Sequence, residues 1–177
     1  MFPNAQPDRS NLHVLHRNTL PTRAHFFIYP NEDQSLALDR EQSEYHSLNG
    51  TWKFKRDASP FEAPDWETCN PLTWDNINVP GMWQLQGYGR PLYTNHAYPF
   101  PVNPPHVPYL NETGSYWRQF SIPTKWDGQQ IRLRFEGADG AFPIWVNGKR
   151  SVIPKAAVTR ASLTSLPSYG LLVQTTP

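Results

Sequence analysis

The segment YWRQFSIPTKWDGQQIRLRFEGADGAFPIWVNG, residues 116–148, decides the fold class. Apolar and polar side chains roughly alternate over Tyr116–Ile122 and strictly alternate over Ile131–Phe135. A period of two is typical of a strand with one buried face. The apolar run Ala141–Val146 is followed by Asn147-Gly148, a dipeptide that favours a tight hairpin turn. The segment therefore predicts three successive β-strands.

Two further strands are expected upstream of this segment. Thr51–Lys55 alternates after the turn signal Asn49-Gly50, and Ile77–Val79 is a short strand stopped by Pro80-Gly81. The chain has 19 prolines in 177 residues, about twice the usual share of roughly 5%. Because an interior proline removes a backbone donor and clashes with the preceding turn, the chain is not mostly helical. Five strands without an amphipathic helix predict an all-β sandwich or jelly roll.

Charge and cysteine content exclude several classes of protein. The 16 basic and 15 acidic residues give a net charge of +1, which argues against a nucleic-acid or membrane-surface module. The first thirty residues hold no long apolar run, so neither a signal peptide nor a membrane span is expected. The only cysteine, Cys69, allows no disulfide framework, which is typical of a reducing compartment. We therefore expect a cytoplasmic protein.

The familiar sequence signatures of catalysis are missing from the 177 residues. The histidines lack carboxylates at ligand spacing, and there is no His-Glu-x-x-His motif. There is no Gly-x-Ser-x-Gly elbow, and Gly87-Tyr88-Gly89 leads into Arg90-Pro91 rather than into a helix that could bind phosphate. The sequence itself predicts neither a catalytic residue nor a metal site.

Residues 80–114 form a proline-rich loop with seven prolines and almost no periodic pattern, and loops of this length are usually functional. The loop combines aromatic rings with side-chain amides, namely Trp83, Gln84, Gln86, Tyr88, Tyr93, Asn95, Tyr98, Phe100 and Asn103. Rings can cover the C–H faces of a sugar while amides bond its hydroxyls. Alternatively, the rings fasten the loop to its sheet. Composition leaves both interpretations open.

Several motifs are shared with one family. They are Tyr93-Thr94-Asn95, Tyr98-Pro99, Val102-Asn103-Pro104-Pro105 and Val107-Pro108 in the loop, Ser47–Trp52, Val79–Gln84 and Gly87-Tyr88 before or at its start, Gly114–Tyr116, Phe135–Gly137, Ala141-Phe142 and Trp145–Gly148 after it, and Arg17-Asn18 and Pro21–Ala24 near the amino terminus. Together, from about residue 17 to residue 150, they resemble β-galactosidases of glycoside hydrolase family two. Gly140 and Pro143 depart from the family's usual serine and histidine, and a proline there suits an edge strand or a bulge.

The resemblance implies an organisation and a binding residue. It implies an extended amino-terminal arm over residues 1–45, and a galactose-binding-like jelly-roll domain over residues 46–150. It also implies that Asn103 binds the galactosyl unit in the active site. The family hydrolyses terminal non-reducing β-D-galactose residues of lactose-type substrates with retention, using two glutamates on a later barrel. The magnesium and sodium ligands also lie beyond this chain, so no cofactor is expected on it, and full-length members are homo-oligomers.

Residues 151–177 depart from the resemblance. Family members usually continue after the Asn-Gly turn with the peptide Val-Gly-Tyr-Ser-Gln-Gly-Ser-Arg. Some of the codons that encode Ser151–Val158 would encode this peptide if the reading frame began one base earlier. We therefore expect residues 151–177 to be an out-of-frame tail, with no alternating strand over Ala161–Thr176 to close the sheets. The jelly roll would then be incomplete, and the chain alone would not be a stable monomer. Six core side chains would be partly uncovered: Trp52, Trp117, Phe120, Leu133, Phe135 and Trp145.

The resemblance thus implies the amino-terminal part of a β-galactosidase, with one substrate contact and no catalytic carboxylate. This chain alone is expected to be inactive, and to have no nucleic-acid or membrane partner. Two alternatives stay open. One is a stand-alone, non-enzymatic galactoside-binding module. The other is a short interaction protein that complements a truncated enzyme through its arm.

Overall fold

The computed structural model describes residues 8–21, 24–65, 67–92, 100–104, 106–138, 140–154, 159–163 and 169–175. Their only α-helix is the short α1, Glu32–Leu36. The strands are β1 (His16–Arg17), β2 (Gly50–Asp57), β3 (Asp75–Val79), β4 (Thr113–Phe120), β5 (Ile131–Phe135), β6 (Ile144–Val146), β7 (Lys149–Pro154), β8 (Thr159–Leu163) and β9 (Tyr169–Thr175). Single 3-10 turns are η1 (Asp8–Ser10), η2 (Arg40–Gln42), η3 (Pro71–Thr73), η4 (Trp83–Gln86) and η5 (Thr124–Trp126).

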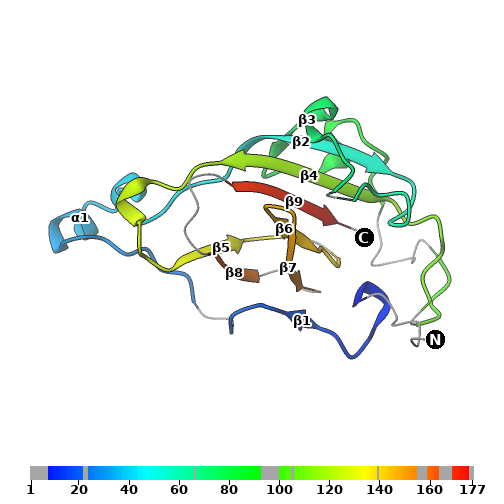
Figure 1. The fold of residues 1–177 in the computed structure, drawn as a ribbon, viewed down its shortest axis with the longest axis horizontal. Helices are drawn as coiled ribbons and strands as arrows, with labels where there is room; N and C mark the ends of the chain where they lie inside the picture. The colour runs from blue at the N-terminus through cyan, green and yellow to red at the C-terminus, as the bar shows by residue number, and fades with distance from the viewer. Residues whose placement is uncertain are drawn as a thin grey trace.

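The strands form two antiparallel sheets, which confirms the all-β class. The larger sheet has the order β1-β7-β6-β9-β4-β2-β3, and β5 pairs with β8 in the smaller one. Figure 1 shows β2, β3, β4 and β9 in one layer, with β5 and β8 below them in this view. A single core joins the layers, because Trp52 and Phe54 of β2 belong to the same buried cluster as Ile131 and Leu133 of β5.

The five strands expected from the sequence are present as β2 to β6. The bounds differ most at β4, which spans Thr113–Phe120 rather than Tyr116–Ile122. β6 begins at Ile144 rather than at Ala141. Pro143 stands directly before this strand. Because β6 pairs on both sides, with β7 and β9, a proline inside it would interrupt a ladder of hydrogen bonds. The register also shifts between Ile144 and Trp145, which accommodates the irregular start.

The expectation that Ala161–Thr176 supplies no strand to close the sheets, which rested on its lack of alternation, is wrong. β8 pairs with β5, and β9 lies between β4 and β6 in the larger sheet. Ladder bonds join backbone N–H and C=O groups, which every residue except proline supplies in full, and neither β8 nor β9 contains proline. The run Leu171-Leu172-Val173 also ends in a residue type that favours strands. A strand can therefore form here without the alternation that sequence reasoning required.

The expected exposure of the core is wrong for three of the six side chains named above. Trp52, Phe120 and Leu133 are only 5%, 9% and 8% exposed. Trp117, Phe135 and Trp145 are half-buried. The instability of the isolated chain stays a prediction, but the argument from absent strands no longer supports it.

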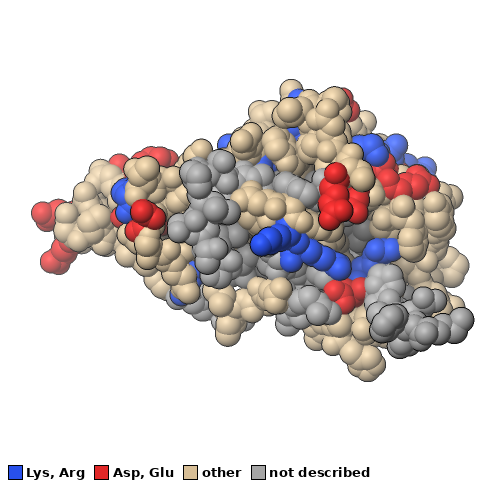
Figure 2. Space-filling model, viewed as in Figure 1, with Lys and Arg blue, Asp and Glu red and all other residues tan. Residues whose placement is uncertain are grey.

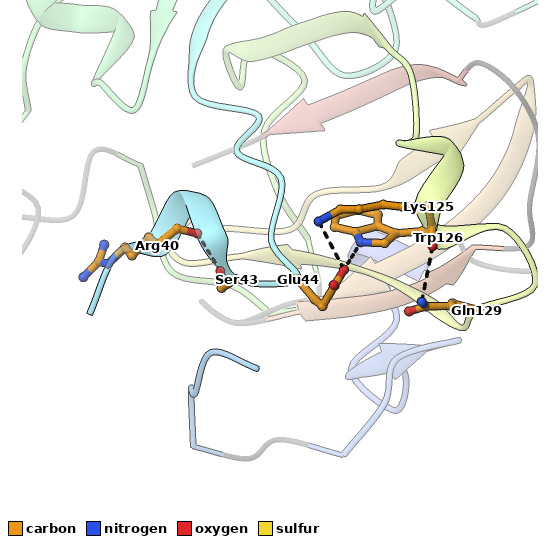
Figure 3. A network of polar contacts seen from close by, with 6 residues as sticks. All are labelled: Arg40, Ser43, Glu44, Lys125, Trp126 and Gln129. Carbon is orange, nitrogen blue, oxygen red and sulfur yellow. Dashed lines mark hydrogen bonds and ion pairs between the residues drawn. The ribbon is translucent and has the colours of Figure 1, made fainter. Parts of the chain in front are cut away.

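The arm lies against its own domain. β1 pairs with β7, and His25 Nδ1 lies 3.4 Å from Glu136 Oε1 beyond β5. In Figure 3, the Glu44 carboxylate accepts a hydrogen bond from the Trp126 indole N–H and lies 3.7 Å from Lys125 Nζ. The expected helical turn around Trp66 is not tested, because that residue lies outside the described ones.

We predict that the Trp126 indole fastens the arm more strongly than the neighbouring ammonium. Trp126 is 9% exposed, and hydrogen bonds to charged groups are worth about 1.5–3 kcal/mol. Because Glu44 is partly solvated, Trp126→Phe should lower the free energy of unfolding by about 1–2 kcal/mol. It should also speed trypsin cleavage within residues 24–45.

Two variants control this prediction. Lys125→Met removes an exposed ion pair, so it should cost less than about 0.5 kcal/mol. Glu44→Gln keeps the volume but weakens the acceptor, so its effect should lie between the other two. Equal denaturation midpoints for Trp126→Phe and Lys125→Met would contradict the assignment.

Candidate functional site

The proline-rich loop presents Asn103 at a fixed turn. The His106 N–H donates to the Asn103 carbonyl over 2.8 Å, which closes a four-residue turn containing Pro104. Proline restricts φ, so this turn loses little freedom when a ligand binds. A hydrogen bond within the loop thus closes the turn that carries Asn103.

The Asn103 side chain is exposed. Among the described residues, no hydrogen bond to its amide is found. A free amide offers N–H donors and a carbonyl acceptor, which can bond neighbouring hydroxyls of one sugar. The geometry is thus compatible with the expected contact, although no bound sugar tests it. Tyr93, Asn95 and Tyr98, the other candidates in the middle of the loop, lie outside the described residues.

At the start of the loop, the aromatic rings fasten the chain to the sheet. Trp83 is 6% exposed and meets the Phe54 ring at a centroid distance of 5.6 Å. Tyr88 meets the same ring at 4.7 Å and donates its hydroxyl to Asp75 over 3.1 Å. Burial, and then this bond, raise the pKa of Tyr88 and keep the phenol protonated. For Trp83 and Tyr88, the interpretation as loop anchors is correct.

The Gln86 amide also has a structural role. Its Oε1 accepts from the Asn78 N–H over 2.8 Å, and its Nε2 donates to the Asn78 carbonyl over 3.0 Å. These two bonds imitate strand pairing along the free edge of β3. The amide is therefore occupied, and Gln86 is removed from the candidate sugar contacts.

A small hollow lies beside the end of the loop, which sequence reasoning missed. Loop residues Val107, Pro108 and Asn111 line it together with Arg9 of the arm and Phe61. Phe61 stacks on Tyr109 with an interplanar angle of 4°, and the Arg9 guanidinium lies 4.6 Å from the Phe61 centroid. Phe61 and Tyr109 each follow a proline, but nothing local in the sequence pairs them. The arm and the loop thus meet at one aromatic stack.

A second hollow lies on the opposite side of the large sheet from the core. Its wall includes Thr51, Lys53, Asn76, Trp117 and Gln119. Lys53 pairs with both Asn76 and Trp117, so these side chains share the outward face. The Lys53 ammonium is held by the Trp74 carbonyl at 3.1 Å. No residue expected to bind a sugar lies there.

The described residues carry mixed charges and hold no cluster of candidate metal ligands. Figure 2 shows acidic and basic side chains interspersed on the visible face, without a broad basic area. Among the described residues, no three histidine, cysteine or acidic side chains lie close enough to hold a metal ion. The resemblance places the magnesium and sodium ligands beyond this chain, so neither ion is assigned to these residues. In the same part of the chain, no helix is long and apolar enough to cross a bilayer.

The solved structures that this chain resembles share its fold. They include the β-glucuronidase of an uncultured Clostridium, with a TM-score of 0.51 and 23% identity over 73% of this chain and 21% of that one. The β-glucuronidase of Faecalibacterium prausnitzii gives a TM-score of 0.54 and 21% identity over 73% and 20% of the two chains. At this identity, the likeness concerns the fold alone.

Sequence relatives are closer. The chain is 39% identical to the β-galactosidase of Psychromonas ingrahamii over 147 residues, which are 80% of this chain and 14% of the relative. It is also 39% identical to the β-galactosidase of Kluyveromyces lactis, over 76% of this chain and 13% of the relative. The chain therefore spans only a small part of the length of these relatives.

A family model described as "Glycosyl hydrolases family 2, sugar binding domain" matches residues 45–164. The match starts one residue before the boundary expected between arm and domain, and extends beyond residue 150. It agrees with the motifs around Asn103 and with the all-β sheets that carry them. The chain belongs to glycosyl hydrolase family 2, through the sugar-binding domain of that family.

Proposed function

We propose that this chain is the amino-terminal part of a β-galactosidase that acts on terminal non-reducing β-D-galactose residues of lactose-type substrates. The observation that carries the proposal is the 39% identity to two β-galactosidases over most of this chain. The exposed Asn103 amide, on a turn closed by its own carbonyl, is compatible with the sugar contact that the resemblance implies. Within this proposal, Asn103 donates to one galactosyl hydroxyl and accepts from its neighbour.

The bond-breaking chemistry belongs to another part of such an enzyme. Hydrolysis with retention needs two carboxyl groups about 5–5.5 Å apart, one as acid/base and one as nucleophile. We assign no residue of this chain to either role. Magnesium and sodium would likewise be held by residues outside this chain. Homo-oligomerisation is proposed from the resemblance, and a cytoplasmic location from the single cysteine, Cys69.

The origin of residues 151–177 is a separate proposal. The codon argument supports an out-of-frame tail following the jelly-roll domain of residues 46–150. Such a tail could still form strands where the in-frame sequence would form them, because strands pair through backbone hydrogen bonds that depend little on the side chains.

One observation favours a stand-alone galactoside-binding module as a second candidate. β9 pairs with both β4 and β6, so the larger sheet is continuous across the chain. A module that closes its own sheets could bind methyl β-D-galactoside without further domains. The amino-terminal part of an enzyme does not require such binding, and a calorimetric titration of the isolated chain separates the two candidates.

We predict that Asn103→Ala weakens catalysis by an enzyme of the relatives' length that carries this chain at its amino terminus. Leaving polar partners unpaired costs about 1–3 kcal/mol, so kcat/KM for a chromogenic galactoside should fall about 5- to 150-fold. Val102→Ala is the matched control, because Val102 is 71% exposed and adjacent but has no polar group. If both variants keep the wild-type kcat/KM, Asn103 does not bind the galactosyl unit as the resemblance implies.

The purified 177-residue chain should hydrolyse no β-galactoside. A positioned proton donor and a nucleophile are both necessary for glycoside hydrolysis, and this chain is assigned neither. The assay is release of chromophore from an aryl β-galactoside, with protein from a host that lacks its own β-galactosidase. Turnover that copurifies with the chain would show that it contains a catalytic site.

A further inference from the structure

An ion pair joins strand β2 to the end of the proline-rich loop. Arg56 is the penultimate residue of β2, and Glu112 directly precedes β4. Arg56 Nη1 lies 2.5 Å from Glu112 Oε1, and the two side chains are 38% and 47% exposed. The contact crosses between neighbouring strands, at the point where the loop rejoins the sheet.

The start of the loop lies against the same ion pair. Gly89 has φ +67°, and a Cβ built on it would lie 2.8 Å from Glu112 Oε2 and 3.5 Å from Arg56 Nη1. A side chain at this position would meet both the left-handed backbone conformation and the carboxylate. Glycine therefore lets the chain pass here without strain and without moving the Glu112 carboxylate. Gly89 and Glu112, which bracket Asn103, therefore lie close together beside the Arg56–Glu112 ion pair.

We propose that the Arg56–Glu112 pair, packed against Gly89, is a positioning device that closes the base of the loop presenting Asn103. With both ends of the loop held, the turn at Asn103 keeps a constant direction relative to the sheet. Arg56 and Glu112 are positioning residues rather than sugar contacts. The effect of this pair on sugar binding rests on the proposed role of Asn103. The closure of the loop by the pair does not depend on that role.

The expected effect of removing the pair is small and local. Trp83 and Tyr88 still hold the start of the loop on Phe54. A partly exposed ion pair contributes little to overall stability, so its loss should change the opening of the loop about two- to fivefold without unfolding the domain.

The test is hydrogen exchange at the His106 amide, measured on the 177-residue chain. This N–H donates to the Asn103 carbonyl and reports directly on the turn. Arg56→Met and Glu112→Gln should each raise its exchange rate about two- to fivefold, with the thermal midpoint unchanged. The charge-swapped double variant, Arg56→Glu with Glu112→Arg, should recover most of the protection.

High salt and substitutions of two glycines distinguish a specific effect of the ion pair on the loop from a general increase in flexibility. Raising NaCl to about 1 M shortens the screening length to about 3 Å, so it should speed exchange in the wild type but not in Arg56→Met. Gly89→Ala should also speed exchange. Gly128→Ala is its control, because Gly128 has φ +73° with nothing within 4 Å of the added Cβ.

Three results would overturn the proposal: wild-type exchange at His106 in Arg56→Met, equal effects of the two glycine variants, or an unprotected His106 amide in the wild type. Asn103→Ala should leave this exchange rate unchanged, since no partner of its amide is found among the described residues. Failure of loop closure and failure of the sugar contact are therefore measured separately.

Discussion

The loop that carries the candidate site depends on the absence of a side chain at Gly114. A Cβ there would lie 2.0 Å from Trp83 Cζ3 and 2.9 Å from the Phe54 ring. Gly114 stands in β4, where the loop ends, and Trp83 stands in η4, where it begins. The bare backbone lets the indole lie on the strand, so both ends of the loop meet on the same part of the sheet.

In the proposed enzyme, this domain positions a substrate contact, and other parts of the protein carry out the bond-breaking chemistry. The buried rings and the ion pair at Arg56 hold the loop, and the loop holds the Asn103 turn. None of these groups needs to exchange protons with a substrate. A domain built in this way can supply one oriented amide to an active site whose carboxylates lie elsewhere.

Sequence reasoning succeeded where the signal was local. Alternation located β2 and β5, and the proline-rich composition identified the loop around Asn103. It failed where structure depends on distant partners. Rings that bind sugar and rings that anchor a loop look alike in sequence, so the burial of Trp83 could not be foreseen. The Arg56–Glu112 contact joins residues 56 positions apart, and β9 forms by backbone pairing that leaves no side-chain pattern.

A double-mutant cycle between Trp83 and Gly114 tests the account most directly, with unfolding free energies measured by chemical denaturation. If the indole occupies the space above Gly114, Gly114→Ala should cost about 1–3 kcal/mol in the wild type through overpacking. In a Trp83→Leu background, the same substitution should cost less than half as much. An equal cost in both backgrounds would mean that Trp83 does not lie on β4, and that the loop is held in another way.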